Sequence, residues 1–296
     1  MIIDMHVRIG RGREVELSAP DLLSTMAELG IDAALISPDE RGIAYDNLEG
    51  NDAVCRAAAE SDGKLAAYAV ANPWQGRRAL DVLARARDAG AVALAVDPVL
   101  QGFDPLDGLL DPLLEFAKDE DWFVYVRTGT PPNALPLPVA TLARRHPELR
   151  FVMGRSGATD FWIDAAPALR HAPNLYADTA YAPWDTVLTE LAQDEEIGPQ
   201  RCVFATDAPY AVARTELARV LDWQGITEAQ RAAVLGGTIA QLLGRNLPPA
   251  WSRESGGAGH DAETSRDAQA SSDARPADSD ERPVMTGHDE VDRSGD

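Results

Sequence analysis

Eight short apolar runs alternate along the chain with segments of helical periodicity, and few folds accommodate that order. Each run is almost continuously apolar, which is typical of parallel strands buried on both faces. Eight β-then-α units without a hairpin signal predict a closed (β/α)8 TIM barrel. The expected strands are Met1–Met5, Ala33–Ser37, Leu65–Ala71, Val92–Val96, Trp122–Val126, Arg150–Met153, Leu175–Ala177 and Cys202–Ala205.

The segments between the runs have the residue spacing of amphipathic helices. An open, doubly wound sheet is the alternative arrangement, but no glycine-rich phosphate loop follows the first strand. The expected helices are about Asp21–Leu29, Asn51–Ser61, Gly76–Ala89, Leu106–Glu120, Leu137–His146, Thr159–His171, Trp184–Gln193 and Arg214–Asp222, with a closing helix at about Glu228–Leu243.

The composition changes after Leu247. Residues 248–296 contain 12 Asp or Glu and 5 Arg but no apolar run. Such a segment buries too little apolar surface to offset the entropy lost on ordering, so it is predicted to be a disordered acidic tail. Residues 1–247 have the size of a single barrel domain.

The chain is strongly acidic, with a net charge of −21, of which the tail accounts for −7 and residues 1–247 for about −14. This charge repels phosphate backbones and anionic membranes, so neither nucleic acid nor membrane is an expected partner. Only Lys64 and Lys118 are lysines, a composition typical of halophilic proteins, although a GC-rich genome would also favour arginine. Met1 leads directly into the first strand and no apolar run approaches about 18 residues, so a cytoplasmic location is expected.

Barrels of this kind carry their chemistry at the carboxyl ends of the strands. Nearly every expected strand delivers a polar side chain there, and an arginine buried without a partner is costly. Ser37 and Ser156 also follow strands, but no histidine base is expected beside either, so a serine nucleophile is not expected. The candidate site residues are His6, Arg8, Asn72, Asp97, Arg127, Arg155, Asp178 and Asp207.

Several segments occur together in a recognisable order. Residues 1–245 resemble the amidohydrolase-related family, the branch that includes aminocarboxymuconate semialdehyde decarboxylases and pyrone dicarboxylate lactonases. Each segment alone is a weak signal, but their order and spacing are specific. They are Ile3-Asp4-Met5-His6, Asn72-Pro73, Val126-Arg127-Thr128-Gly129, Phe151-Val152-Met153-Gly154-Arg155-Ser156-Gly157, Asn174-Leu175-Tyr176-Ala177-Asp178-Thr179, Phe204-Ala205-Thr206-Asp207-Ala208-Pro209 and Leu235-Gly236-Gly237-Thr238-Ile239-Ala240-Gln241-Leu242-Leu243.

The resemblance implies a metal site made of a His-x-His pair, one histidine from each of strands five and six, and an aspartate from strand eight. His6 and Asp207 match this pattern, whereas Arg8, Arg127 and Arg155 occupy the three other histidine positions. Arginine stays protonated and cannot ligate a metal. Three guanidinium groups within about 5–6 Å would each repel a divalent cation by several kcal/mol. The sequence therefore predicts no bound metal and no other cofactor.

Without a metal, the arginines are expected to bind a small anionic molecule through their planar forks. Asn72, Asp97 and Asp178 are further candidates for substrate binding. Asp207 would be the general base that activates water, and His6 an orienting group or acid. The resemblance supports a lactonase-like hydrolase, since pyrone dicarboxylate lactonases need no metal.

Three alternatives remain open. In the first, the three arginines bind no ligand and pair with the neighbouring aspartates as a buried ionic network that replaces the metal. In the second, the chain is a non-catalytic barrel that binds a small anion or a protein partner. In the third, it is an ordinary metal-dependent hydrolase or decarboxylase. The sequence leaves open the substrate, and an oligomer is possible.

Overall fold

The computed structural model describes residues 1–157 and 160–252. The tail predicted for residues 248–296 lies, from residue 253 onward, outside the described residues. Packing continues past Leu247, because the side chain of Trp251 is buried and its Nε1 donates to the carbonyl oxygen of Gly63 (2.6 Å).

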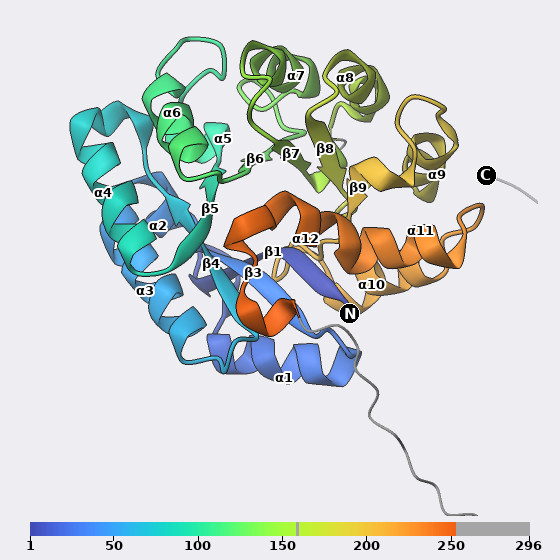
Figure 1. Ribbon diagram of the computed structural model, residues 1–296, viewed down its shortest axis with the longest axis horizontal. Coiled ribbons are helices and arrows are strands. Elements are labelled where there is room, and N and C mark those ends of the chain that lie inside the picture. Colours follow the sequence, from blue (N-terminus) through green and yellow to red (C-terminus); the bar gives the residue numbers. More distant parts are fainter. Residues whose placement is uncertain (158–159, 253–296) are drawn as a thin grey trace, which may run out of the picture. The chain divides into compact units, whose positions relative to one another are not determined.

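Eight parallel strands follow one another around the sheet in chain order, as predicted (Figure 1). Backbone hydrogen bonds close the sheet, since Met5 N donates to Phe204 O (3.0 Å) and Arg8 N donates to Ala208 O (2.9 Å). The barrel prediction is therefore confirmed. The parallel strands are β1 (Ile3–Arg11), β3 (Ala33–Pro38), β4 (Leu65–Val70), β5 (Ala91–Val96), β6 (Val124–Arg127), β7 (Phe151–Gly154), β8 (Leu175–Asp178) and β9 (Cys202–Val203).

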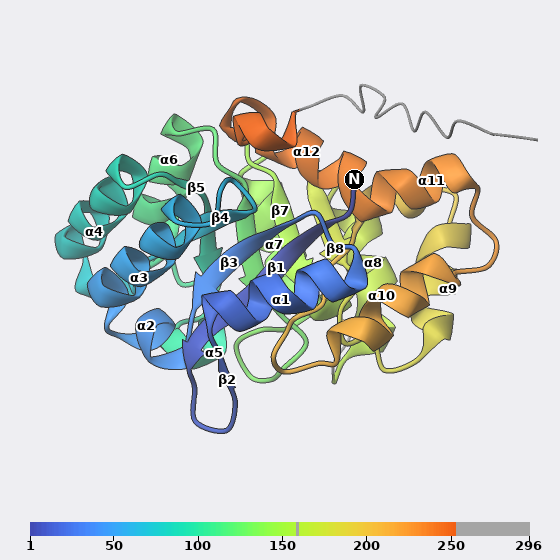
Figure 2. The ribbon, with the colours of Figure 1, turned by 90° about the horizontal axis from the view of Figure 1, so that it is seen from below.

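The expectation that the first strand ends at Met5 without a hairpin is wrong. β1 runs on to Arg11 and pairs antiparallel with β2 (Glu16–Leu17). This hairpin projects from the carboxyl end of the barrel (Figure 2). It is only two residue pairs long and largely exposed. It therefore lacks the apolar alternation by which longer hairpins are recognised.

The helices surround the barrel and agree with the predicted segments within a few residues at most of their ends (Figures 1 and 2). They are α1 (Ala19–Leu29), α3 (Asn47–Ala59), α4 (Arg77–Asp88), α6 (Asp111–Asp119), α7 (Pro136–Arg145), α8 (Ala165–His171), α9 (Asp185–Gln193) and α10 (Ala213–Leu221), with two short unpredicted helices, α2 (Glu40–Ala44) and α5 (Pro98–Gln101). Six 3₁₀ turns complete the set within the described residues: Pro73–Gln75, Arg155–Gly157, Trp162–Asp164, Pro199–Arg201, Gly244–Asn246 and Pro249–Trp251.

The closing helix is not continuous as predicted. α11 (Glu228–Ala232) and α12 (Thr238–Leu243) are joined by a π-helical segment, Ala233–Gly237. A Cβ atom on Gly236 would lie 2.5 Å from the carbonyl oxygen of Met1, so glycine allows this segment to approach the start of β1.

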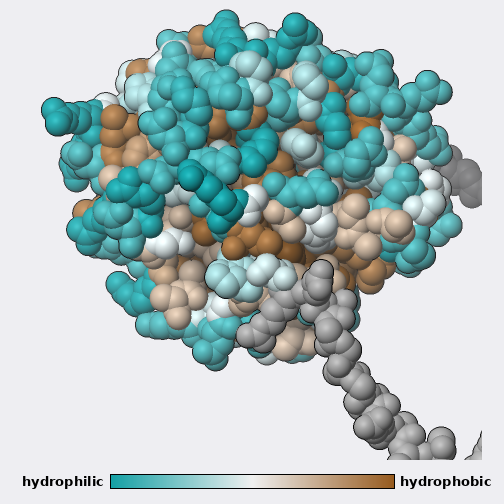
Figure 3. All heavy atoms as spheres, in the orientation of Figure 1, coloured by the Kyte–Doolittle hydropathy of each residue, from teal (hydrophilic) through white to brown (hydrophobic). Residues whose placement is uncertain are grey.

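Apolar side chains fill two layers, one inside the barrel and one between the sheet and the helices. Along β3, Ala33 and Leu35 point into the barrel, whereas Ala34 and Ile36 point toward the helices. Hydrophilic side chains cover most of the face seen in Figure 3. None of the helices in the described part of the chain is long and apolar enough to cross a membrane.

Candidate functional site

A bulge in β1 turns two polar side chains into the barrel. Asp4 pairs with Ala34 and Val7 with Ile36, so β1 contains one residue more than β3 over this stretch. Ile3 and Met5 belong to the interior layer, whereas Val7 and Ile9 belong to the outer one. The extra residue therefore changes the phase of the strand, and His6 and Arg8 both face inward.

Hydrogen bonds of Asp4 connect the bulge to the segment that follows β9. Its Oδ1 accepts hydrogen bonds from the backbone nitrogens of Thr206 (2.9 Å) and His6 (3.2 Å), and its Oδ2 accepts one from the Thr206 hydroxyl. Burial raises the pKa of Asp4 to about 7 despite these bonds. The contacts fix the segment that carries Asp207, whose own nitrogen donates to His6 O (3.2 Å).

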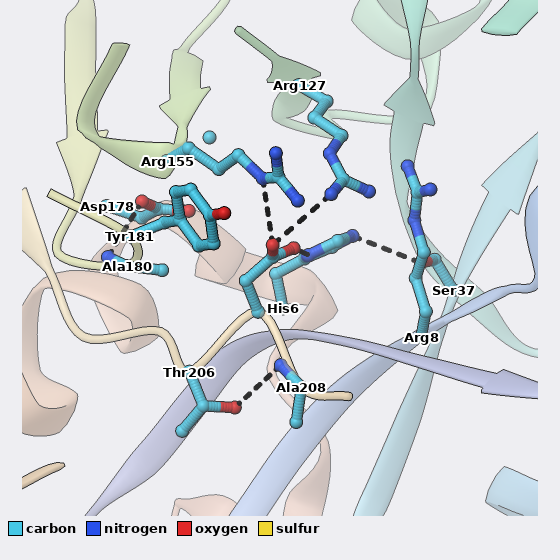
Figure 4. Close-up of polar contacts among 12 residues, drawn as sticks. His6, Arg8, Ser37, Arg127, Arg155, Asp178, Ala180, Tyr181, Thr206 and Ala208 are labelled. Carbon is cyan, nitrogen blue, oxygen red and sulfur yellow. Dashed lines mark hydrogen bonds and ion pairs between the residues drawn. The ribbon is translucent and has the colours of Figure 1, made fainter. Parts of the chain in front are cut away.

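Arg127 and Arg155 point toward one carboxylate (Figure 4), and their hydrogen bonds identify it as that of Asp207. Its Oδ2 accepts hydrogen bonds from Arg155 Nε (2.8 Å) and Arg127 Nη2 (3.3 Å), which come from the ends of two adjacent strands, β7 and β6. Burial alone would raise the pKa of Asp207, but His6 and the charges of Arg155 and Arg8 outweigh burial and lower it. The carboxylate is therefore ionised at neutral pH.

Arg8 forms a separate ion pair. Its Nη2 donates to Asp97 Oδ2 (2.6 Å), and the Oδ1 of Asp97 accepts a hydrogen bond from the backbone nitrogen of Leu100 (3.0 Å) at the start of α5. The side chain of Arg8 is 4% exposed, and its Nε has no hydrogen-bond partner in the part of the chain that the structure describes. Arg8 therefore contributes to the mouth as one half of a buried ion pair.

His6 lies beneath the arginines and stacks on the ring of Tyr125, with 4.1 Å between ring centroids. Its Nδ1 lies 3.3 Å from Asp207 Oδ1, but neither atom has a partner in hydrogen-bond geometry among the described residues. Burial lowers the pKa of His6 although Asp207 raises it, so the imidazole is neutral at pH 7.

The expectation that no histidine lies beside Ser37 is wrong. Ser37 Oγ is 3.1 Å from His6 Nε2, because the β1 bulge and the alternation of β3 turn both side chains into the barrel. Ser37, His6 and Asp207 thus form a continuous polar chain. All three side chains are at most 1% exposed, so this chain lies out of reach of solvent.

A cavity of about 200 Å³ opens above this buried chain at the barrel mouth. Tyr210 covers one side of it, with its ring centroid 4.7 Å from the guanidinium carbon of Arg127 and 5.5 Å from that of Arg8. Aromatic faces attract guanidinium groups, so Tyr210 helps hold the arginines in place. The lining residues are Arg8, Glu40, Asp97, Val99, Leu100, Arg127, Thr128, Thr130, Ala134, Arg155 and Tyr210, whereas His6 and Asp207 are not among them.

Two predicted binding residues, Asn72 and Asp178, lie outside this cavity. Asn72 caps the turn Pro73–Gln75, with its Oδ1 accepting from Trp74 N (3.1 Å). Asp178 accepts hydrogen bonds from Ser156 N (2.9 Å) and Ala180 N (3.1 Å), and burial raises its pKa to about 8. The structure thus gives both residues roles in holding strand-end loops, and within the described residues neither forms an ion pair with an arginine of the mouth.

The residues of the site that the sequence did not single out include Ser37 as a partner of His6, Glu40 and Tyr210. Tyr210 directly follows the segment Thr206–Pro209 after the last strand, and this position was the available signal. Glu40 carried no such signal, because it reaches the mouth from the first turn of the unpredicted helix α2.

The side chains at the mouth do not fit a catalytic divalent cation. Such an ion needs about three converging N, O or S ligands, whereas Arg8, Arg127 and Arg155 offer only donors. The Oδ2 of Asp207 already accepts from two of them. Among the described residues, the one cluster of three potential ligands is Glu115, His146 and Glu148, at the amino end of β7.

The sequence model of the amidohydrolase family matches residues 3–245, and the site positions above lie within that match. The chain belongs to the amidohydrolase family. No curated protein sequence matches this family member.

Solved structures with the same fold include enzymes of different activities. A dihydroxybenzoic acid decarboxylase from Polaromonas sp. JS666, with bound manganese, is 15% identical (TM-score 0.63; 83% of this chain and 98% of that chain covered). A TIM-barrel protein from Bordetella bronchiseptica is 18% identical (TM-score 0.67; 83% and 99% covered). A probable 2-pyrone-4,6-dicarboxylic acid hydrolase from Acinetobacter baumannii, with bound citric acid, is 13% identical (TM-score 0.61; 82% and 99% covered).

Proposed function

We propose that this amidohydrolase-family barrel binds a small carboxylate-bearing molecule at its mouth without a metal ion. The observation that carries the proposal is the unused donor capacity of the cluster. Arg127 and Arg155 each donate one hydrogen bond within the described residues, in both cases to Asp207. A guanidinium group has five N–H donors, so most of them remain available beside the cavity.

The charge of the cluster favours the same ligand. Arg8, Arg127 and Arg155 face two carboxylates, those of Asp97 and Asp207, which leaves one positive charge without a partner in the cluster. Planar guanidinium groups bind carboxylates through paired hydrogen bonds. The solved relative with bound citric acid supports the proposal as an analogy of fold.

The test is calorimetric titration of the metal-stripped protein with butyrate at constant ionic strength. Arg127→Gln and Arg155→Gln are each expected to weaken binding at least tenfold. Arg85→Gln, which alters an exposed arginine on α4, is the matched control and should leave binding unchanged. Binding that needs an added divalent metal, or that both mouth variants leave intact, refutes the proposal.

Hydrolysis is a second candidate function. The observation that favours it is that Asp207 Oδ1, 3.3 Å from His6 Nδ1, accepts no hydrogen bond within the described residues and so has a lone pair available to take a proton. Asp207 is buried and does not line the cavity, so a substrate carboxylate would have to draw Arg127 and Arg155 away from it before water could reach it and it could act as a general base. Asp207 would then take a proton from water, whose oxygen attacks a lactone carbonyl while a guanidinium group stabilises the oxyanion. Collapse of this adduct breaks the ring C–O bond, and the leaving alkoxide takes the proton from Asp207.

The test is turnover of carboxylate-bearing lactones in the presence of a chelator. The wild-type protein is expected to open the ring, and Asp207→Asn should abolish turnover while the protein still binds butyrate. Turnover that survives in Asp207→Asn, or no turnover of any lactone by protein that binds butyrate, removes hydrolysis and leaves a binding protein.

A further inference from the structure

We propose that the mouth selects a zwitterionic amino carboxylate over a dicarboxylate, and that Glu40 sets this preference; the inference rests on the proposed carboxylate site. The cavity is lined by acidic as well as basic side chains, and because Asp97 pairs with Arg8, Glu40 is the lining carboxylate without an arginine partner among the described residues. A ligand with one negative and one positive group matches such a cavity.

The positions of the charges follow from the order of the strands. Arg155 follows β7, and Glu40 begins the helix that follows β3. In the closed ring of eight parallel strands, β3 and β7 are four strands apart in either direction. Glu40 therefore lies across the barrel from Arg155, and the mouth has a basic and an acidic side.

Glu40 is held at the acidic side by the hairpin of β1 and β2. Its Oε2 accepts a hydrogen bond from the backbone nitrogen of Arg13 (2.7 Å), and the residue is half-buried. No arginine, lysine or histidine within residues 1–157 and 160–252 forms an ion pair with it. A half-buried carboxylate without a cationic partner attracts a positive group of a ligand.

Tyr210 lies close to Glu40 as well as to the arginines of the mouth. Burial raises the pKa of the Tyr210 hydroxyl to about 12, with Arg8 lowering it and Glu40 raising it. The same ring lies over Arg127, so Tyr210 is near both Glu40 and the basic side of the mouth.

The charges of the three arginines and their two aspartates balance one carboxylate of a ligand, and not two. Arg8 is neutralised by Asp97 at 2.6 Å, and Arg127 and Arg155 share Asp207, so one carboxylate balances the basic side. A second carboxylate would reach toward Glu40 and meet a like charge. An ammonium group in the same place would meet an opposite charge.

The test compares three four-carbon ligands by calorimetry at constant ionic strength: butyrate, 4-aminobutyrate and succinate. The wild-type protein is expected to bind 4-aminobutyrate about tenfold more tightly than butyrate, and succinate less tightly than butyrate. Glu40→Gln keeps an oxygen that accepts from Arg13 N but removes the charge. It should reduce the affinity for 4-aminobutyrate about tenfold and increase the affinity for succinate.

Glu60→Gln, at the exposed end of α3, is the matched control and should leave all three affinities unchanged. Butyrate binding at least as tight as 4-aminobutyrate binding in the wild type, or a Glu40→Gln variant with the wild-type order, overturns the inference but leaves the carboxylate site intact. Absence of binding by all three ligands refutes the carboxylate site and this inference with it.

Discussion

Replacing Asp207 by asparagine removes the one carboxylate that two arginines of the mouth share. Oδ2 of Asp207 accepts from Arg155 Nε at 2.8 Å and from Arg127 Nη2 at 3.3 Å, and the aspartate side chain is fully buried. Breaking a buried ion pair on one side costs about 3–5 kcal/mol. The two arginines are 11% and 14% exposed, so solvent screens part of the loss and we expect about 3 kcal/mol, at the lower end of that range.

For a domain of about 250 residues this loss corresponds to a decrease of about 6–12 °C in Tm. The assay is thermal unfolding followed by circular dichroism, with and without butyrate. Asp185→Asn is the matched control, because it breaks an exposed pair with Arg219 and should cost less than about 1 kcal/mol.

The stabilisation of Asp207→Asn by added anions distinguishes the loss of an ion pair from a general loss of packing. The Asp207→Asn protein has arginines without their counter-ion, so a carboxylate should stabilise it more than it stabilises the wild type. At a ligand concentration of about 100 Kd the gain is about 2.7 kcal/mol. A variant with wild-type Tm, or one that butyrate stabilises less than the wild type, would refute this account of the cluster.

Three further predictions concern stability. Burial raises the pKa of Asp178 to about 8, so between its ordinary pKa and pH 8 the folded protein holds a proton that unfolding releases. Tm should therefore fall as pH rises through this window. A pH series should show a weaker fall of Tm in Asp178→Asn. Ser37→Ala leaves His6 Nε2 without its partner and should cost about 1–3 kcal/mol in chemical denaturation, whereas an unchanged stability would contradict the contact. The net charge of −21 predicts that molar KCl raises Tm by screening self-repulsion, and an unchanged Tm would contradict salt adaptation.

The barrel was predictable because each of its strands is marked by a pattern within a few consecutive residues. Each strand is a short apolar run, and buried parallel strands need little else. The convergence of Arg127, Arg155 and Asp207 was also predictable, since carboxyl ends of barrel strands meet at one face. Sequence alone left open whether the arginines bind an anion or pair with aspartates, and the structure contains ion pairs together with unused donors.

What could not be predicted depends on contacts between distant segments. Ser37 contacts His6 only through the phase of β1, which no residue pattern reveals. Glu40 is placed by a backbone nitrogen of a hairpin too short to have a sequence signature. Asp178 has the composition of a ligand-binding residue, but three hydrogen bonds from the chain itself use its oxygens.

The single additional residue between Asp4 and Val7 determines which side of the sheet each later residue of β1 faces. Deleting that residue would exchange the two sides of the strand, sending the guanidinium of Arg8 toward α1 and the aliphatic chains of Val7 and Ile9 into the mouth. Point substitutions can adjust this wall of the mouth gradually, but a change of strand length by one residue would replace its charge with an apolar surface.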